Sequence, residues 1–227
     1  MDSRIFVIGR DPVPEYIRLE AGESLRWTFV FCPSVAGGGC RPVRPSEPET
    51  GERLLGTHSP DSADSADRVR VEIDLCGPGA EVDIAGLYLC RGEEKLDLDV
   101  LVRHTSGGCV SRQNFKGIVG GKAKASFEGL IYVAKDAQKT RAYQENHTIL
   151  LDDTARVESR PQLEIYADDV ECSHGATTGF LNEEELFYMR SRGIPEAEAR
   201  RLQMISFLAP VLERLPEDLK NDIISEC

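Results

Sequence analysis

The chain has 227 residues, 41% of them hydrophobic and 29% charged, a length that suits one large domain or one domain with an appendage. Its formal net charge of -12 disfavours binding to nucleic acid or to an anionic membrane surface, because both would repel it. No apolar run approaches the ~18 residues of a membrane span. The first residues lack a signal-peptide core, so we expect a cytoplasmic protein. Its 7 cysteines show no compact spacing pattern, which predicts free thiols.

Composition divides the chain into four segments. Residues 1–31 are typical of short N-terminal strands. Residues 32–67 are rich in Gly, Pro, Ser and Asp, which predicts a flexible loop or insertion. Residues 68–180 alternate between apolar and polar side chains, and residues 181–227 have the signals of helices.

The alternating segment predicts many strands with one buried face each. No helical pattern interrupts it before about residue 181, which excludes a doubly wound α/β fold and leaves a sandwich, a barrel or a β-solenoid. Two stretches, residues 79–89 and 121–132, share small alternating residues, then a glycine, then a short apolar run. This self-similarity favours a solenoid. The alternating apolar positions are Val69, Val71, Ile73, Leu75, Val82, Ile84, Leu96, Leu98, Val100, Val102, Ala123, Ala125, Phe127, Leu163 and Ile165.

The last segment predicts three helices. Asn182 is a good N-cap, and Glu185 is placed to complete a capping box with it. This helix is expected to end near Gly193. Pro195 then begins a second helix, which Pro210 is expected to kink or split. Pro216 opens a last short helix that ends near Cys227.

The stretch DDVECSHGATTG, residues 168–179, places Cys172 and His174 two residues apart. In an extended strand the two side chains share one face, roughly 6.5–7 Å apart at their Cα atoms. A thiolate and an imidazole in that arrangement suit iron, zinc or copper, or an iron–sulfur cluster. A nucleophile with its base, or a plain turn with a buried cysteine, are the alternatives. Spacing alone leaves all three open.

Other cysteines and histidines carry weaker signals. Cys32 and Cys40 with His58 lack a fourth ligand and a standard zinc spacing, so free thiols in a loop are the simpler interpretation. His104 continues a strand alternation and is expected to be a core or rim histidine. His147 lies in a polar stretch and is expected to be exposed. The sequence offers little that is typical of an enzyme.

Several motifs together resemble the SufB/SufD family of iron–sulfur cluster assembly proteins. The resemblance covers roughly residues 70–215 and rests on the order and spacing of all the motifs. They are NFKGI (114–118), AQKT (137–140), YQEN (143–146), LL (150–151), PQLEIYADDV (161–170), CSHGAT (172–177), LFY (186–188) and SRGI (191–194).

The resemblance implies a mainly β fold: a right-handed parallel β-helix followed by a small C-terminal helical domain. It also implies a non-catalytic scaffold role in the SUF system. In the family two β-helix subunits associate, their helical domains dock onto an ABC-type ATPase named SufC, and a transient iron–sulfur cluster forms at the interface between the two β-helices.

Three positions place the chain in the SufD-like branch. SufB-like members have His-Glu where this chain has His174-Gly175, and a cysteine where it has Met189. They also carry a sulfur-accepting cysteine in the region of residues 144–147, which is absent here. In the SufD-like branch the histidine of the CSHGA motif contributes to the cluster site. The chain is much shorter than a typical SufD, so a homodimer stands beside a heterodimer with a SufB-like chain.

The resemblance therefore implies a cluster site at His174, with Cys172 as its neighbour on the same face. Glu171, Asp168 and Asp169 are expected to tune or orient the ligand. The partner is a SufB-like paralogue or a second copy of the chain. A purely structural subunit without a cluster ligand is the alternative, and a polysaccharide-acting solenoid enzyme is a weaker one. The expected docking surface for the ATPase consists of Leu186, Phe187, Tyr188, Arg190 and Arg192.

Overall fold

The computed structural model describes residues 2–35 and 67–227, which form eleven strands and three helices. The first strands are β1 (Asp2–Val7), β2 (Tyr16–Leu19), β3 (Ser24–Phe31), β4 (Asp67–Leu75), β5 (Glu81–Cys90) and β6 (Lys95–His104). The remaining strands are β7 (Val110–Val119), β8 (Lys124–Val133), β9 (Arg141–Leu150), β10 (Arg156–Ile165) and β11 (Glu171–Gly179). The helices are α1 (Glu183–Ser191), α2 (Glu196–Leu212) and α3 (Glu217–Glu226).

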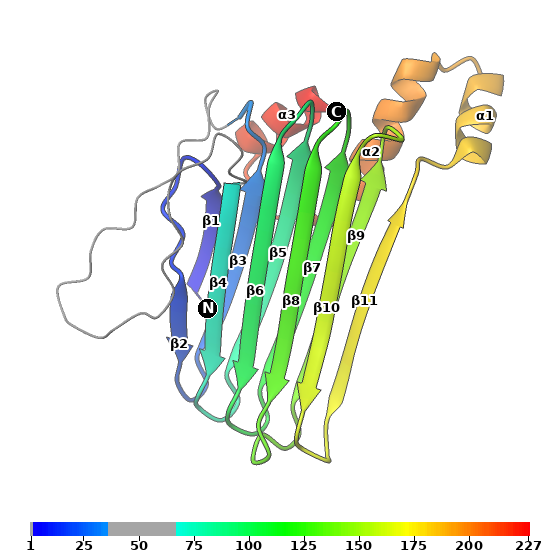
Figure 1. Cartoon of the computed structure of the whole chain (residues 1–227). Helices are drawn as coiled ribbons and strands as arrows, with labels where there is room; N and C mark the ends of the chain where they lie inside the picture. The colour runs from blue at the N-terminus through cyan, green and yellow to red at the C-terminus, as the bar shows by residue number, and fades with distance from the viewer. Residues whose placement is uncertain (1, 36–66) are drawn as a thin grey trace.

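The strands form a parallel β-helix. Sheet A has the order β1-β3-β5-β7-β9-β11 and sheet B has the order β10-β8-β6-β4-β2. Each strand pairs in parallel with the strand two places along the chain, so every coil contributes one strand to each sheet (Figure 1). The predicted fold class, a β-solenoid followed by a C-terminal helical unit, is confirmed. The division into four segments stays a prediction, because most of the proposed insertion, residues 36–66, lies outside the described residues.

The core lies between the two sheets and is built from the alternating positions. Val71, Ile73 and Leu75 of β4 are at most 1% exposed, and the same alternation recurs on β6. Aromatic rings fill the first coils, where Phe6 and Trp27 lie edge to face with ring centroids 4.8 Å apart. The period of two thus puts one face of each strand into a shared interior.

The turns from sheet B to sheet A are stacked in a ladder. Gly22, Gly79, Gly108 and Lys139 all have positive φ, between 61° and 71°. The N–H of each donates to a carbonyl of the equivalent turn in the next coil, ending with Lys139 N–H to the Asp169 carbonyl at 2.6 Å. Glycine relieves the strain of this conformation in three coils, and a lysine occupies it in the fourth.

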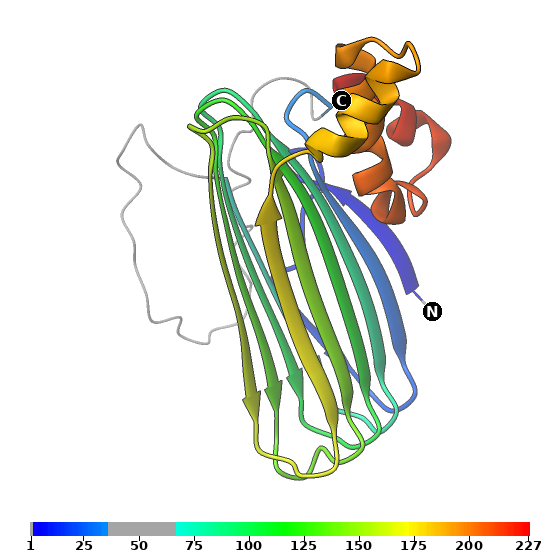
Figure 2. The ribbon, with the colours of Figure 1, turned by 90° about the vertical axis from the view of Figure 1, so that its right-hand side faces the viewer.

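The helical unit covers part of the outer face of sheet A, at the end of the molecule where the strands of that sheet finish (Figure 2). Leu208, Val211 and Ile223 are fully buried there against outward side chains of the sheet such as Leu87 and Ile118. The N–H group at Nη2 of Arg214, just after α2, also donates to Asp83 of β5. The unit is therefore a packed extension of the β-helix.

Two details of the helices differ from prediction. Asn182 caps α1 as expected, its Oδ1 accepting from the N–H groups of Glu184 and Glu185. The Asn182 N–H, however, donates to Oε1 of Gln203 in α2 at 3.1 Å instead of to Glu185. Pro210 does not split α2, because it lies in the last turn and the helix ends two residues later. The last helix follows Pro216 as predicted.

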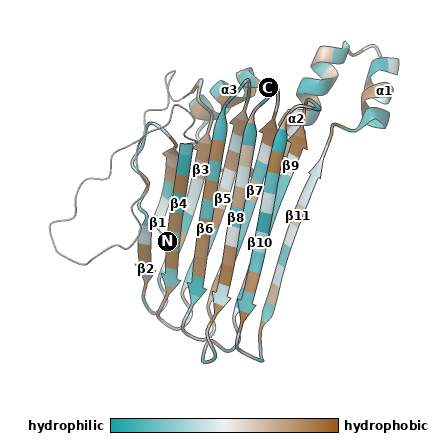
Figure 3. Ribbon diagram, in the orientation of Figure 1, coloured by the Kyte–Doolittle hydropathy of each residue, from teal (hydrophilic) through white to brown (hydrophobic). Residues whose placement is uncertain are grey.

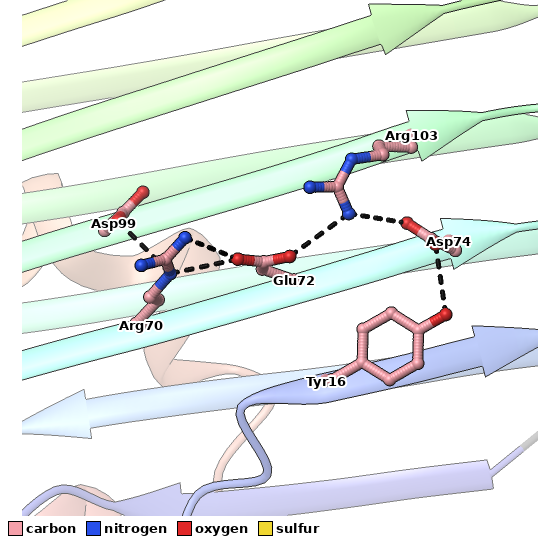
Figure 4. Close-up of polar contacts among 6 residues, drawn as sticks. All are labelled: Tyr16, Arg70, Glu72, Asp74, Asp99 and Arg103. Atoms are coloured by element: carbon pink, nitrogen blue, oxygen red, sulfur yellow. Dashed lines mark hydrogen bonds and ion pairs between the residues drawn. The ribbon is translucent and has the colours of Figure 1, made fainter. Parts of the chain in front are cut away.

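The outer face of sheet B carries a chain of ion pairs across β2, β4 and β6 (Figure 4). Arg103 Nη1 lies 3.1 Å from Glu72 and 3.0 Å from Asp74, and the Tyr16 hydroxyl donates to Asp74 at 3.1 Å. Arg70 pairs with Glu72 and Asp99 on the other side. Every charge in this row has a partner of opposite sign, which marks a solvated sheet surface.

Candidate functional site

Cys172 and His174 both lie on the inward face of β11. They pair in register with Ala142 and Gln144 of β9, which are fully buried. Cys172 is half-buried, and it packs against a small cluster that includes Ile131 and Ala142. His174, two residues on, is exposed. The structure thus brings the two side chains onto one face, as their spacing predicts.

His174 is exposed because the last coil, β10 with β11, has no coil above it in the described part of the chain. Inward residues of β9 such as Asn146 and Thr148 are at most 3% exposed, whereas Ala176 and Thr178, their partners on β11, are exposed. The strand consists mostly of small residues of intermediate hydropathy and has no large apolar side chain, as its pale colours in Figure 3 show. The interior of the β-helix is open at this end.

The two strands of the last coil differ as sheet edges. Each is the final strand of its sheet within residues 2–35 and 67–227. β10 carries Pro161 at its centre, which removes one backbone donor, and such prolines protect sheet edges from pairing. β11 has no proline. The free edge suited to further strand pairing is therefore β11.

Burial controls the chemistry of Cys172. Burial raises the pKa of its thiol, against a smaller opposing effect of the hydrogen bond from the backbone of Ala142. The thiol is therefore protonated at neutral pH until a metal displaces the proton. Among the residues that the structure describes, no three His, Cys, Asp or Glu side chains lie close enough to hold a metal ion. Within that part of the chain, Cys172 and His174 have no third donor of these types beside them.

The carboxylates near the motif lie elsewhere. Glu171 is on the outer face of sheet A, where its Oε2 accepts from the Tyr143 hydroxyl at 3.0 Å. Asp168 and Asp169 form the turn between β10 and β11. The backbone N–H of Asp169 donates to Oε1 of Gln138 and its carbonyl accepts from Lys139. The structure does not bring these three acids to His174.

Polar side chains instead fill the interior next to the last coil. Gln144 Nε2 donates to Gln113 Oε1 at 2.9 Å, and both residues are at most 2% exposed. Asn146 donates to Ser159 at 2.9 Å and accepts from the Tyr88 hydroxyl at 3.1 Å. The sequence did not predict this group, because the stretch from Gln144 to His147 is polar throughout. The period-two alternation of the neighbouring strands, continued into β9, places Gln144 and Asn146 on the inward face.

The predicted ATPase-docking residues separate into two sets. Leu186 is 3% exposed and packs inside the helical unit. Phe187 and Tyr188 are 74% and 59% exposed, Arg192 lies over the Tyr188 ring, and Arg190 pairs with Glu196. An open hollow of about 450 Å³ lies beside them, lined by Asn182, Glu184, Glu185, Tyr188 and Met189. This helix stands next to the end of β11 (Figures 1 and 2).

Three of the other predicted candidates, His104, His147 and Cys32, lie within the described residues. His104 is a core histidine, as predicted, with Nε2 2.9 Å from the Ser111 hydroxyl. His147 lies on the outer face of sheet A, 2.6 Å from the hydroxyl of Thr177, and it is partly covered where exposure was predicted. Cys32 is buried after β3, whereas Cys40 and His58 lie outside the described residues.

Comparison with known proteins agrees with this architecture. Residues 61–207 match the family model of the SUF system FeS cluster assembly, SufBD core domain. The chain is 40% identical over 159 residues to the iron–sulfur cluster assembly protein SufD of Escherichia coli (strain K12), covering 70% of this chain and 38% of that protein.

Other relatives are similar at comparable levels. The chain is 38% identical over 152 residues to protein ABCI7, chloroplastic, of Arabidopsis thaliana, covering 66% of this chain and 32% of that protein. It is 33% identical over 156 residues to SufD of Bacillus subtilis (strain 168), covering 67% and 35%. The chain thus spans less than two-fifths of the length of these relatives.

No helix among the described residues is both long and apolar enough to cross a membrane. Three findings support the same family assignment: the parallel β-helix, the CSHGAT strand at its open end, and the match over residues 61–207. The chain belongs to the SufB/SufD family of SUF-system iron–sulfur cluster assembly proteins and is SufD-like.

Proposed function

We propose that this chain is a non-catalytic scaffold subunit on which a transient iron–sulfur cluster is assembled at an interface between two β-helices. The observation that carries the proposal is the open last coil with His174 on its inward face. Solenoids need their ends covered, because each coil buries its inner face only against its neighbours. The side chain that is left uncovered here is a metal-binding imidazole.

The chemistry of the exposed pair suits iron. A neutral imidazole binds iron near pH 7, and a thiol does so once the metal displaces its proton. His174 is the ligand in this proposal, and Cys172 is a second donor on the same face. The cluster is the cargo of the assembly, and the remaining ligands come from the subunit that covers the coil.

The partner that we favour is a SufB-like β-helix, with a second copy of the chain as the competing outcome. Pairing through the free edge of β11 would extend sheet A and close the interior over Ala176 and Thr178. Ala176→Asp, which puts a charge on the inward face, is expected to abolish pairing. Ser173→Asp, on the outer face of the same strand, should leave it intact. Sedimentation of mixed and single subunits separates heterodimer from homodimer.

The ATPase-docking surface of the proposal consists of Phe187, Tyr188, Arg190 and Arg192, without the buried Leu186. Its two exposed aromatic rings next to two guanidinium groups are typical of the centre of a protein interface. The proposal gives no role in the ligand arrangement to Glu171, which bonds Tyr143 on the outer face, or to Asp168 and Asp169, which lie in the turn before β11. A cytoplasmic location belongs to the same proposal and is consistent with the bacterial relatives.

The ligand role is tested by anaerobic reconstitution with a SufB-like subunit and a SufC-like ATPase. Iron and sulfide bound per complex are measured for the wild type, His174→Ala and Cys172→Ala. His147→Ala is the matched control, because His147 lies on the outer face of the neighbouring strand. We expect His174→Ala to lose most of the cluster and the control to keep it. An undiminished yield in His174→Ala removes the ligand role.

A purely structural subunit is the second candidate, favoured by the exposed aromatic residues of α1. In that case the chain contributes only dimerisation and ATPase docking. His174→Ala would then be silent, while Phe187→Asp would still abolish the complex.

A further inference from the structure

Gln144 is a fully buried amide with one unsatisfied atom. Its Nε2 donates to Oε1 of Gln113 at 2.9 Å, but its own Oε1 is buried and has no hydrogen-bond partner within the described structure. Buried polar atoms almost always have a partner. An unpaired acceptor at the penultimate coil therefore requires an explanation.

The opposite sheet leaves room for this amide. A Cβ atom added to Gly129 of β8 would lie 2.4 Å from Gln144 Nε2 and 2.5 Å from Oε1. The end of the Gln144 side chain thus reaches across the interior to the backbone of Gly129. Any larger residue at position 129 would push the amide aside.

His174 occupies the next place in the same row. Gln113, Gln144 and His174 are register partners on β7, β9 and β11, and all three lie on the inward face. Adjacent strands are roughly 4.8 Å apart, so the backbone of His174 lies one strand spacing from the backbone of Gln144. Gln113 holds the other side of the amide, which leaves His174 as the register neighbour on the open side.

We propose that Gln144 positions His174: the exposed imidazole turns toward the unpaired Oε1, which then accepts a hydrogen bond from one ring N–H and so fixes which ring nitrogen is free to bind iron. A neutral imidazole has one donor and one acceptor nitrogen, and the hydrogen bond of the first decides which nitrogen is the second. Histidine ligands are generally held by such a partner. The iron-binding part of this inference rests on the proposed function, whereas the hydrogen bond does not.

The hydrogen bond is tested on the full chain without iron. Long-range proton–nitrogen NMR at pH 8 reports the tautomer of each neutral histidine, and His174→Asn identifies the signals of His174. Gln144→Leu removes the acceptor, and Gly129→Ala displaces the amide without removing it. Asn146→Leu is the matched control, a buried amide two residues along β9 that bonds Ser159 and Tyr88 instead.

We expect one dominant His174 tautomer in the wild type and the control, and a mixture in Gln144→Leu and Gly129→Ala. Reconstituted complexes of these two variants should bind iron at the coil about 10-fold more weakly. If Gln144→Leu does not fold, the tautomer of His174 in Gly129→Ala tests the hydrogen bond instead. That variant should fold, because the flexible end of the Gln144 side chain can move away from the added methyl group. An unchanged tautomer in a folded variant overturns the inference. Unchanged cluster yield in His174→Ala overturns the ligand role alone and leaves the hydrogen bond standing.

Discussion

Arg214 and Asp83, 131 residues apart in the chain, join the helical unit to the β-helix through a 2.7 Å contact between Nη2 and Oδ1. Asp83 is held on its other side by Arg26 Nε at 3.1 Å. Nη1 of Arg214 is buried and has no partner in the described structure. One carboxylate therefore pairs with two guanidinium groups at the boundary between the two parts.

Removal of that carboxylate should destabilise the chain more than removal of either arginine. Asp83→Ala leaves Arg214 partly buried and unpaired, which we expect to cost about 1.5–3 kcal/mol in the free energy of unfolding. Arg214→Leu removes a guanidinium group of which Nη2 has a partner and the buried Nη1 has none. Its loss should lower the free energy of unfolding by less than about 1 kcal/mol. Arg26→Ala, at a more exposed position, is the control. Urea denaturation measures all three, and equal losses would contradict the interpretation.

His104 should make the stability depend on pH. Burial lowers the pKa of its imidazole from 6.5 to about 4. Between these values the unfolded chain binds a proton that the folded chain does not. The stabilisation is therefore complete above pH 6.5 and is lost as the pH falls toward 4, by about 3 kcal/mol. Urea titrations of the wild type and His104→Leu at pH 7 and pH 4.5 test this, and parallel losses in both proteins would refute it.

Substitution by alanine should lower the free energy of unfolding by different amounts at three glycines. A Cβ at Gly117 would lie 1.9 Å from the buried, rigid ring of Tyr88, so Gly117→Ala should cost about 1–3 kcal/mol or more. At Gly129 it would meet only the flexible end of Gln144, and the cost should be smaller. Gly175 has nothing within 4 Å, so Gly175→Ala should stay within about 0.5 kcal/mol of the wild type. Thermal and urea unfolding of the three variants measure these losses and test their predicted order.

Two neighbours in α1 should separate docking from folding. Phe187→Asp places a charge on a side chain that is 74% exposed, so the stability should change by less than about 0.5 kcal/mol while binding to the ATPase is lost. Leu186→Asp buries a charge and should unfold the helical unit. Circular dichroism and co-purification with a SufC-like ATPase distinguish the two. Full ATPase binding by Phe187→Asp would exclude this surface.

The sequence predicted the fold well because its main signal is local. Alternation with a period of two assigns the faces of β4, β6 and β8 wherever the strand is regular, and the caps at Asn182 and Pro216 fall where they should. The same rule put Cys172 and His174 on one face. It also implies that Glu171, directly before Cys172, faces the other way, and the structure places it on the outer face beside Tyr143.

The rest of the site depends on relationships between coils. The exposure of His174 follows from its position on the last coil, and no local pattern carries that information. The burial of Gln144 requires Gly129 on the opposite sheet to make room for the amide. Leu186 is buried because it packs in the apolar cluster that α1 shares with α2. These are tertiary effects that override the polarity of a single segment.

The open end of the β-helix has a further consequence for the amount of this protein in a cell. Strands at the end of a solenoid gain packing from one side only, so β10 and β11 should open with a smaller free energy than the strands of the central coils. The subunit proposed to cover them would suppress this opening by mass action. If that proposal holds, unaccompanied copies should be degraded faster, and the abundance of the chain should follow the supply of its companion without any dedicated regulator.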